Sequence, residues 1–273
     1  MQKALEALAE FRYLTIYQMI AADVSTNYSY LTRRMTKELL SPSLAAIGCH
    51  DFGVMPGVGK LARVFFLTDK GAELLAEATQ GDPADIRYPV RGVQFSRDYF
   101  HRLAYVDICI AFSCYMRRNN YKIHGMRHYF DKIGKPRKGT ALYPETRLAL
   151  TRGYVVPDGL FYFETQGKRR VAAVEMHYSP RTSYIIDQLE THFVAIREGA
   201  ASKFFGHDKA NYVFSVFKDT AASERVRTLL MENEDFRKTF FPLFHFNTID
   251  RLKADGFAAG WVMADGSPGG LVS

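Results

Sequence analysis

The stretch VVPDGLFYFE (155–164), with the turn TQGKRR (165–170) and the run VAAVEMHYSPRTS (171–183), decides the fold of this chain. Two apolar runs joined by a short polar turn predict a β-hairpin. Strand side chains alternate between faces, so Glu175 and His177 are expected on one face, with Asp158 beside them when the strands pair. Two carboxylates and an imidazole on one sheet surface can hold a divalent metal ion. The hairpin therefore predicts a metal site.

Each of these three residues also has an ordinary structural interpretation. Asp158 lies in Pro-Asp-Gly, which is a common turn tripeptide. Glu175 can be an ion-pair partner of an arginine across the sheet, although a buried glutamate is rare unless it is paired. A single histidine such as His177 is more often structural than catalytic. The residues alone leave the metal site and these alternatives open.

Length and composition indicate a globular protein that binds a polyanion. The chain has 273 residues, 47% of them hydrophobic, and a net charge of +7, which suits one large or two modest domains with a basic surface. Its three cysteines lack metal-type spacing and favour a reducing compartment. No signal segment and no apolar run of membrane-spanning length is evident, so we expect a cytoplasmic protein without a membrane span.

Positive charge is concentrated around the hairpin. Between Tyr115 and Arg170 there are thirteen Lys and Arg residues and four acidic residues, a local net charge of +9. Such a field favours contact with a nucleic-acid backbone, for which Arg137 and Lys138 are candidates. A set of solvated basic loops is the ordinary alternative.

The N-terminal third has the pattern of a winged helix. The helix expected at 28–39 places Leu31, Met35 and Leu39 on one face and leaves a polar face suited to a DNA major groove. A hairpin over 45–67, the wing, is expected to follow, and then a helix over 68–77. Five candidate DNA-contacting residues follow from this pattern: Arg33, Arg34, Lys37, Lys60 and Arg63. Residues 1–80 have no net charge, which leaves a protein-contact role open.

Breaker residues near position 85 predict a linker between two domains. We expect domains at 1–80 and 86–255 and a flexible tail at 256–273, in an α/β (α+β) fold. In the second domain, the helix at 183–199 is expected to direct Ile186, Leu189, Phe193 and Ile196 inward. The remaining expected elements are a helix at 96–119, strands at 121–130, 212–217 and 240–247, and helices at 223–231 and 249–253.

Pro157-Asp158 and Glu175-Met176-His177 resemble the motif of the PD-(D/E)XK nuclease fold. The run from Glu175 to Ser183 more closely resembles the plasmid replication-relaxation family and the related MOBC-class conjugative relaxases, with His177 in the place of a second Glu and Arg181 in the place of a Lys. The resemblance implies a winged helix followed by a restriction-endonuclease-like mixed-sheet domain.

The resemblance also implies a site chemistry. Asp158 and Glu175 would hold Mg²⁺ or Mn²⁺, and Glu145 is a weaker candidate ligand. His177 would be a third ligand or a general base, and Arg181 would neutralise the scissile phosphate. Tyr178 is a further candidate, as a covalent nucleophile.

Three functions follow as expectations. The first is metal-dependent nicking of double-stranded DNA at a plasmid transfer or replication origin, with mobilization-complex proteins as partners. The second is a catalytically inactive winged-helix DNA-binding replication accessory or transcriptional regulator, which the changes at His177 and Arg181 favour. The third is a protein-interaction module without a DNA role, against which the charge of the central segment argues.

Overall fold

The computed structural model describes residues 1–89, 98–133, 142–179, 181–206 and 211–270. The chain divides into two compact units, Met1–Ile110 (unit 1) and Ala111–Ser273 (unit 2). The division falls inside helix α5 (Tyr99–Arg118), so this helix has residues in both units. The expected domain limits at 80 and 86 stay predictions. In the described ranges, no helix has both the length and the apolar character needed to cross a membrane.

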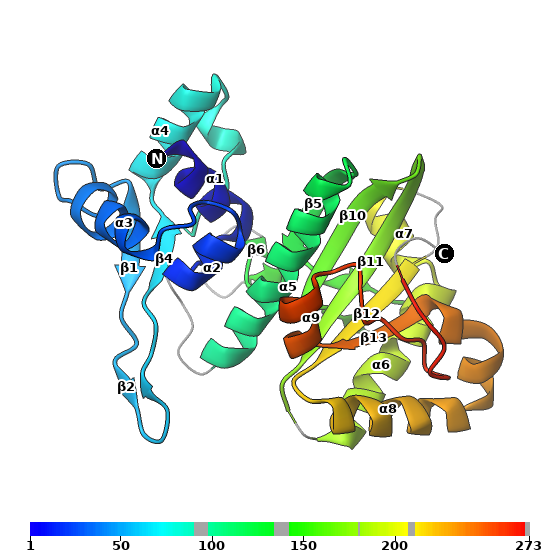
Figure 1. Ribbon diagram of the computed structural model, residues 1–273. Helices are drawn as coiled ribbons and strands as arrows, with labels where there is room; N and C mark the ends of the chain where they lie inside the picture. Colours follow the sequence, from blue (N-terminus) through cyan, green and yellow to red (C-terminus); the bar gives the residue numbers. More distant parts are fainter. Residues whose placement is uncertain (90–97, 134–141, 180, 207–210, 271–273) are drawn as a thin grey trace. The chain divides into compact units, whose positions relative to one another are not determined.

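Unit 1 is built from short helices around a two-stranded antiparallel sheet (Figure 1). Side-chain caps fix where several helices begin: Thr15 and Gln18 form a capping box, and Thr68 caps the helix that follows the sheet. The elements before α5 are α1 (Gln2–Phe11), α2 (Ile16–Ala21), α3 (Tyr28–Arg33), η1 (Arg34–Leu39), β1 (Ile47–His50), β2 (Val54–Met55), β3 (Gly59–Lys60), β4 (Val64–Leu67), α4 (Asp69–Thr79) and η2 (Pro83–Asp85).

The helix predicted at 28–39 is present, but its second half is a π-helix. Asn27 caps α3, and η1 continues it without a break. Leu31, Met35 and Leu39 are all buried, as their spacing predicts. In η1 the bond from the Leu40 N–H to the Met35 carbonyl spans five residues instead of four. Single π-turns of this kind are frequent at functional sites.

The wing begins slightly later than its composition predicts. β1 pairs antiparallel with β4, with Ile47 opposite Leu67, and the small β2–β3 hairpin forms the tip between them.

Inside unit 1, the first half of α5 contacts α2 through Gln18, whose side-chain amide donates to Asp107 Oδ1 at 2.8 Å and to the Leu103 carbonyl at 3.0 Å. Gln18 therefore serves both as helix cap and as inter-helix link.

Unit 2 contains a mixed five-stranded sheet in the order β13-β12-β11-β10-β5 (Figure 1). The β5–β10 and β10–β11 pairs are antiparallel, whereas β11–β12 and β12–β13 are parallel. The chain is therefore an α+β protein with a mixed sheet. The elements after α5 are β5 (Lys122–His128), β6 (Lys132–Ile133), β7 (Tyr143–Pro144), β8 (Leu148–Ala149), β9 (Tyr154–Val155), β10 (Gly159–Thr165), β11 (Lys168–His177), α6 (Thr182–Arg197), α7 (Ala200–Phe205), β12 (Asn211–Phe217), α8 (Thr220–Glu232), η3 (Phe236–Phe240), η4 (Phe241–Leu243), β13 (Phe244–Thr248) and α9 (Ile249–Asp255).

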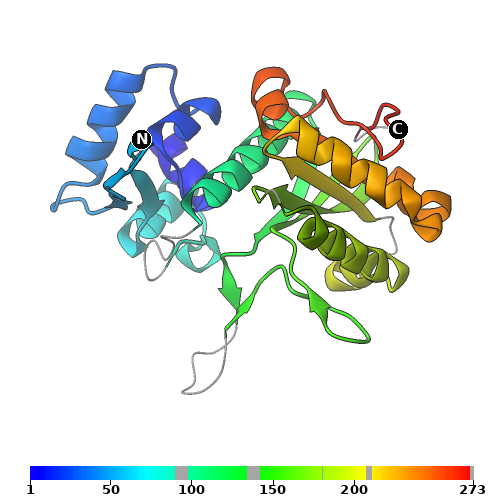
Figure 2. The same cartoon turned by 90° about the horizontal axis from the view of Figure 1, so that it is seen from below.

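Helices α6 and α8 lie side by side over one face of this sheet (Figure 2). Leu189 and Phe193 of α6 join a buried apolar cluster with Ala173 of β11 and Val213 of β12. We call this the α6 face. The opposite face carries Phe161, which stacks on Phe112 of α5 with ring centroids 4.5 Å apart. Because strand side chains alternate, residues 171, 173, 175 and 177 of β11 belong to the α6 face.

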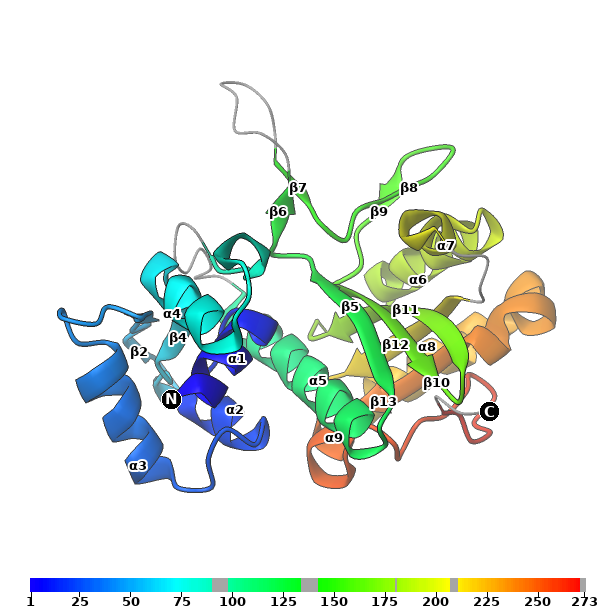
Figure 3. The ribbon, with the colours of Figure 1, turned by 90° about the horizontal axis from the view of Figure 1, so that it is seen from above.

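Two small hairpins, β6–β7 and β8–β9, extend beyond one end of the sheet (Figure 3). Neither hairpin was predicted from the sequence, and α7 was not predicted either. A strand was expected at 240–247, but the strand begins only at Phe244 because Pro242 lies in the preceding 3₁₀ turn. Proline lacks the N–H that a strand ladder requires.

Part of the segment expected to be a flexible tail packs on the sheet, and docking of Phe257 and Trp261 on the core was expected beside that tail. Phe257 and Trp261 are buried, and Val262 forms backbone bridges with Phe246 and Pro268.

Helix α6 buries Leu189 and Phe193 as expected, and the expected Ile186 and Ile196 are partly buried against the same cluster. Ile185 is buried as well.

Candidate functional site on the α6 face

The predicted hairpin is confirmed, and it brings Asp158 next to Glu175. β10 and β11 pair with Gly159 opposite Val174, so Asp158 precedes β10 at the level of Glu175. The Met176 N–H donates to Asp158 Oδ2 at 2.8 Å. Asp158 is half-buried, and its backbone carbonyl accepts from the Tyr129 N–H at 3.0 Å. The Asp158 side chain is thus tied to the strand that carries Glu175.

Glu175 is fully buried, and α6 supplies a donor for each of its carboxylate oxygens. Gln188 donates its side-chain amide to Oε2 at 2.5 Å, and His192 Nε2 lies 2.6 Å from Oε1. Gln188 and His192 are four residues apart, which places both on one side of the helix. Two helical side chains therefore fix the orientation of the carboxylate.

The His192 ring is neutral near pH 7. Burial lowers the pKa of His192 to about 4, against an opposing effect of the Asp158 charge. A neutral ring donates its Nε2–H to Glu175 without adding positive charge. Glu175 consequently receives two hydrogen bonds from neutral side chains, and its carboxylate and that of Asp158 are two groups that would stabilise a cation beside them.

Ser215 of β12 completes a polar row across the sheet. It lies opposite Glu175 in the parallel register and is fully buried. Its hydroxyl has no hydrogen-bond partner among the residues that the structure describes. A buried hydroxyl without a partner commonly marks a place for a water, an ion or a ligand. The row Asp158, Glu175 and Ser215 was not predictable as a set, because Ser215 lies in an ordinary apolar strand pattern.

His177 lies on the same face, as strand alternation predicts, but at the end of β11. Its ring is buried, with the centroid 4.6 Å from that of Phe217. Contact with an aromatic ring in the interior favours the structural interpretation of this residue. Tyr178, next along the chain, lies with its ring 4.8 Å from Lys218 Nζ.

Glu145 lies beside the turn that presents Asp158. It is buried and forms an ion pair with Arg127, Oε1 to Nε 3.1 Å. The neighbouring Thr146 hydroxyl donates to the Pro157 carbonyl at 2.6 Å. Arg181 is exposed at the residue that precedes α6. The structure thus gives Glu145 a cationic partner and leaves Arg181 accessible.

The donor set of Asp158 and Glu175 fits a hard divalent cation. Each carboxylate oxygen has more than one acceptor site, so the bonds from Met176, Gln188 and His192 leave capacity for a metal. Side chains that hydrogen-bond a metal ligand typically fix its orientation. In the described ranges no group of three or more His, Cys, Asp or Glu side chains has a metal-binding arrangement. Mg²⁺ commonly takes only one or two carboxylates and completes its shell with water and substrate phosphates.

In unit 1, the five candidate DNA-contacting residues fall into two classes. Arg33 and Lys37 are exposed on α3 and η1, and Lys60 is exposed on the wing. Arg34, by contrast, forms an ion pair with Glu38 at 2.5 Å.

Arg63 also has an acidic partner, since its Nε lies 2.9 Å from Asp51 Oδ2. That contact raises the pKa of Arg63. A hydrogen bond from the Gly53 N–H, and after it the contact with Arg63, lowers the pKa of Asp51. Arg137 and Lys138 lie outside the described residues.

Sequence reasoning missed Gln188 and His192, the two partners of Glu175. A signal was present, because Gln188-x-x-x-His192 places two polar residues one turn apart within an amphipathic helix. The stripe expected to face inward contained only apolar residues and did not include His192. In the structure His192 is buried.

No family model, no curated protein and no solved structure matches this chain. The resemblance to relaxases consequently rests on the residues of the hairpin alone.

Proposed function

We propose that the protein binds double-stranded DNA and nicks one strand at the Asp158–Glu175 site with Mg²⁺ or Mn²⁺. The observation that supports this proposal is the pairing of two carboxylates on the α6 face, beside the ends of strands β10 and β11, with a buried serine hydroxyl next to them. A plasmid transfer or replication origin is the proposed target, and the proteins of a mobilization complex are proposed partners.

The chain's own residues have distinct parts in this proposal. Asp158 and Glu175 would hold the cation, which would lower the pKa of a bound water and stabilise charge on the phosphate. Gln188 and His192 hold the Glu175 carboxylate in one orientation. Arg181 is exposed and can pair with a phosphate through two N–H groups. His177 supports the strand end through its contact with Phe217.

The unit-1 residues would position the DNA. Arg33 and Lys37 extend from the α3–η1 surface, where a recognition helix presents its polar side chains. Lys60 at the wing would contact the phosphate backbone. The basic segment from Tyr115 to Arg170 would supply further backbone contacts in unit 2.

A second candidate is a DNA-binding replication accessory or regulator without nuclease activity. The observation that favours it is the engagement of both Glu175 oxygens by Gln188 and His192 in a fully buried position. In that case the carboxylate stabilises the contact between α6 and the sheet, and no metal is needed there.

A nicking assay separates the two candidates. Supercoiled plasmid carrying candidate origin DNA is incubated with the protein and Mg²⁺ or Mn²⁺, with and without a chelator, while DNA binding is followed separately. Metal-dependent relaxation that Asp158→Asn abolishes supports the nuclease. DNA binding without relaxation, and without metal uptake by calorimetry, supports the accessory protein. Absence of DNA binding contradicts both.

A further inference from the structure

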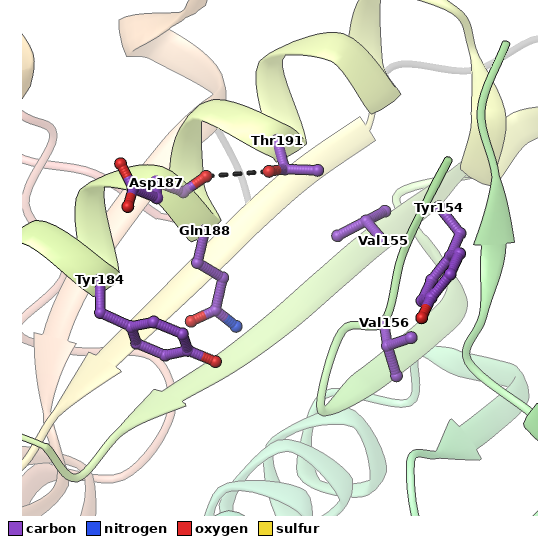
Figure 4. Close-up of a pocket in the computed structure, with 7 residues that line it drawn as sticks. All are labelled: Tyr154, Val155, Val156, Tyr184, Asp187, Gln188 and Thr191. Carbon is purple, nitrogen blue, oxygen red and sulfur yellow. Dashed lines mark hydrogen bonds between the residues drawn. The ribbon is translucent and has the colours of Figure 1, made fainter. Parts of the chain in front are cut away.

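Unit 2 has a pocket of about 320 Å³ between α6 and the β9 segment (Figure 4). Tyr184, Asp187, Gln188 and Thr191 of α6 line one side, and the segment 154–156 lines the other. This volume is at the small end of the range for ligand pockets, which suits a compact planar group better than a large ligand. The pocket borders the candidate site because Gln188 belongs to both.

Two tyrosines at the border of the pocket are unusually exposed. Tyr154 is 55% exposed and Tyr184 is 63% exposed. They come from opposite sides, one from β9 and one from α6 (Figure 4). Aromatic rings exposed at a concave site are typical of surfaces on which bases or other rings stack.

Arg147 holds one of these tyrosines in place. Its guanidinium lies 4.1 Å from the centroid of Tyr154 and 4.2 Å from that of Tyr143, so it is in contact with both rings. The stack immobilises Tyr154 before any ligand arrives, and it keeps a positive charge beside the pocket. A planar group with an attached phosphate would meet both a ring and a cation there.

The polar groups of the pocket can hydrogen-bond the edge of a base. Gln188 donates an amide N–H to Glu175. The side-chain carbonyl oxygen of Gln188 can still accept a hydrogen bond. The Thr191 hydroxyl donates to the Asp187 carbonyl at 2.9 Å and keeps acceptor capacity. This wall therefore offers acceptors, for which the amino groups of adenine, cytosine or guanine are matching donors.

We propose that this pocket receives one unstacked nucleobase of single-stranded DNA, held by Tyr154 and Tyr184 and by acceptors on α6. The proposal rests on the proposed DNA-binding function and extends it by naming the form of DNA that occupies unit 2. A base inside a duplex has both faces covered by its neighbours, so only a single-stranded or extruded base can enter. A base in the pocket would contact Gln188, which also donates the hydrogen bond that orients Glu175.

The test uses the full chain and a single-stranded oligonucleotide that contains one 2-aminopurine. We expect the wild-type protein to bind it and to quench its emission, since stacking on a ring quenches this base. Tyr154→Ala and Tyr184→Ala should each weaken single-strand binding by roughly 5- to 150-fold, the range for one base–aromatic stack. Tyr184→Phe should retain the affinity, because the ring remains.

The controls distinguish the pocket from general effects. Phe204→Ala removes another exposed ring of unit 2, 39% exposed on α7, and should change nothing. Duplex binding should be unchanged in every variant. Unaltered single-strand affinity in both alanine variants would overturn the pocket and leave the proposed function standing. An equal loss on single strands and duplex would also overturn it, and a wild-type protein that binds neither form contradicts the proposed function itself.

Discussion

Units 1 and 2 differ in where they carry their charge. Unit 1 contains twelve Lys and Arg residues and twelve acidic residues, whereas unit 2 contains 24 and 17, so the whole excess of +7 belongs to unit 2. Unit 2 nevertheless buries the carboxylates of Glu145 and Glu175, while the buried charged side chains described in unit 1 are arginines, Arg12 and Arg102. A buried carboxylate in a unit of positive net charge is a better indicator of a functional site than the net charge of that unit.

We propose different tasks for the two units. In unit 1, Arg33 and Lys37 are exposed on a neutral body, which suits recognition of a particular DNA sequence. In unit 2, the positive segment from Tyr115 to Arg170 contains Asp158 and ends five residues before Glu175, so the proposed backbone contacts and the proposed chemistry fall in one part of the sequence. Each prediction below tests one side of this division.

The largest effect is expected inside unit 2. Asp158→Asn removes the charge but keeps an oxygen that can accept the Met176 N–H. If Asp158 holds the catalytic cation, the nicking rate should fall by roughly two to four orders of magnitude, while duplex affinity stays the same or rises because a repulsive charge is gone. Plasmid relaxation and fluorescence anisotropy measure the two quantities.

Glu164→Gln is the matched control. It removes one negative charge from β10, the strand that Asp158 precedes, at a position where Glu164 contacts His124 and Arg169 and not the site. Its nicking rate should equal that of the wild type. A similar defect in both variants would assign the effect to the charge of the sheet and would remove Asp158 from the mechanism.

The loss of folding stability at low pH should also arise in unit 2. Burial lowers the pKa of His245 to about 4, and neither of its ring nitrogens has a hydrogen-bond partner among the described residues. As the pH falls, His245 is protonated first in the unfolded chain, near the ordinary pKa of histidine. The contribution of neutral His245 to the free energy of unfolding is therefore fully present above about pH 6.5 and is lost as the pH drops towards 4. The loss should reach roughly 2–3 kcal/mol for this one group.

His245→Leu should flatten that dependence in urea unfolding measured at pH 7 and at pH 5. His50→Leu in unit 1 is the control, because His50 is exposed and its replacement should leave the slope unchanged. An undiminished pH dependence in His245→Leu would show that another group, such as His192, causes the acid sensitivity.

A smaller effect is expected in unit 1. Arg33 is exposed on α3, whereas its neighbour Arg34 is paired with Glu38. Arg33→Ala should cost about 1–3 kcal/mol of binding at a preferred sequence if it contacts a base edge, and Arg34→Ala should cost less. Competition assays with selected and random duplexes measure both. An equal loss on all sequences would show that Arg33 contacts phosphate alone and that specificity does not lie in unit 1.

How much of this was predictable depends on the length of the sequence signal. The β10–β11 hairpin was predictable because it combines long apolar runs with a polar turn, and alternation then placed Glu175 and His177 on one face. The helix over Tyr28 to Leu39 was predictable from three apolar residues at helical spacing. Strands β6 to β9 are each two residues long and have no period to detect.

The site was predictable only in its strand residues. Asp158 and Glu175 are charged residues inside apolar runs, and this contrast identified them. Gln188, His192 and Ser215 look like ordinary residues of an amphipathic helix and a buried strand, so only tertiary packing shows that they meet Glu175. The expected roles of Asp158, Glu175, Arg181 and the metal stay predictions.

The smallest effect concerns the backbone contacts of unit 2. Lys168 is exposed at the turn between β10 and β11, within the segment of highest positive charge. If it contacts one phosphate, Lys168→Ala should lower the slope of log affinity against log salt by about 0.9, because one fewer counterion is released from the duplex. Lys238→Ala is the control, since Lys238 is exposed outside that segment and already pairs with Glu234. Anisotropy titrations over a salt series give both slopes. Equal slopes in the wild type and in Lys168→Ala would exclude the turn from the interface, and a slope near zero in the wild type would remove the electrostatic basis for assigning DNA contact to unit 2.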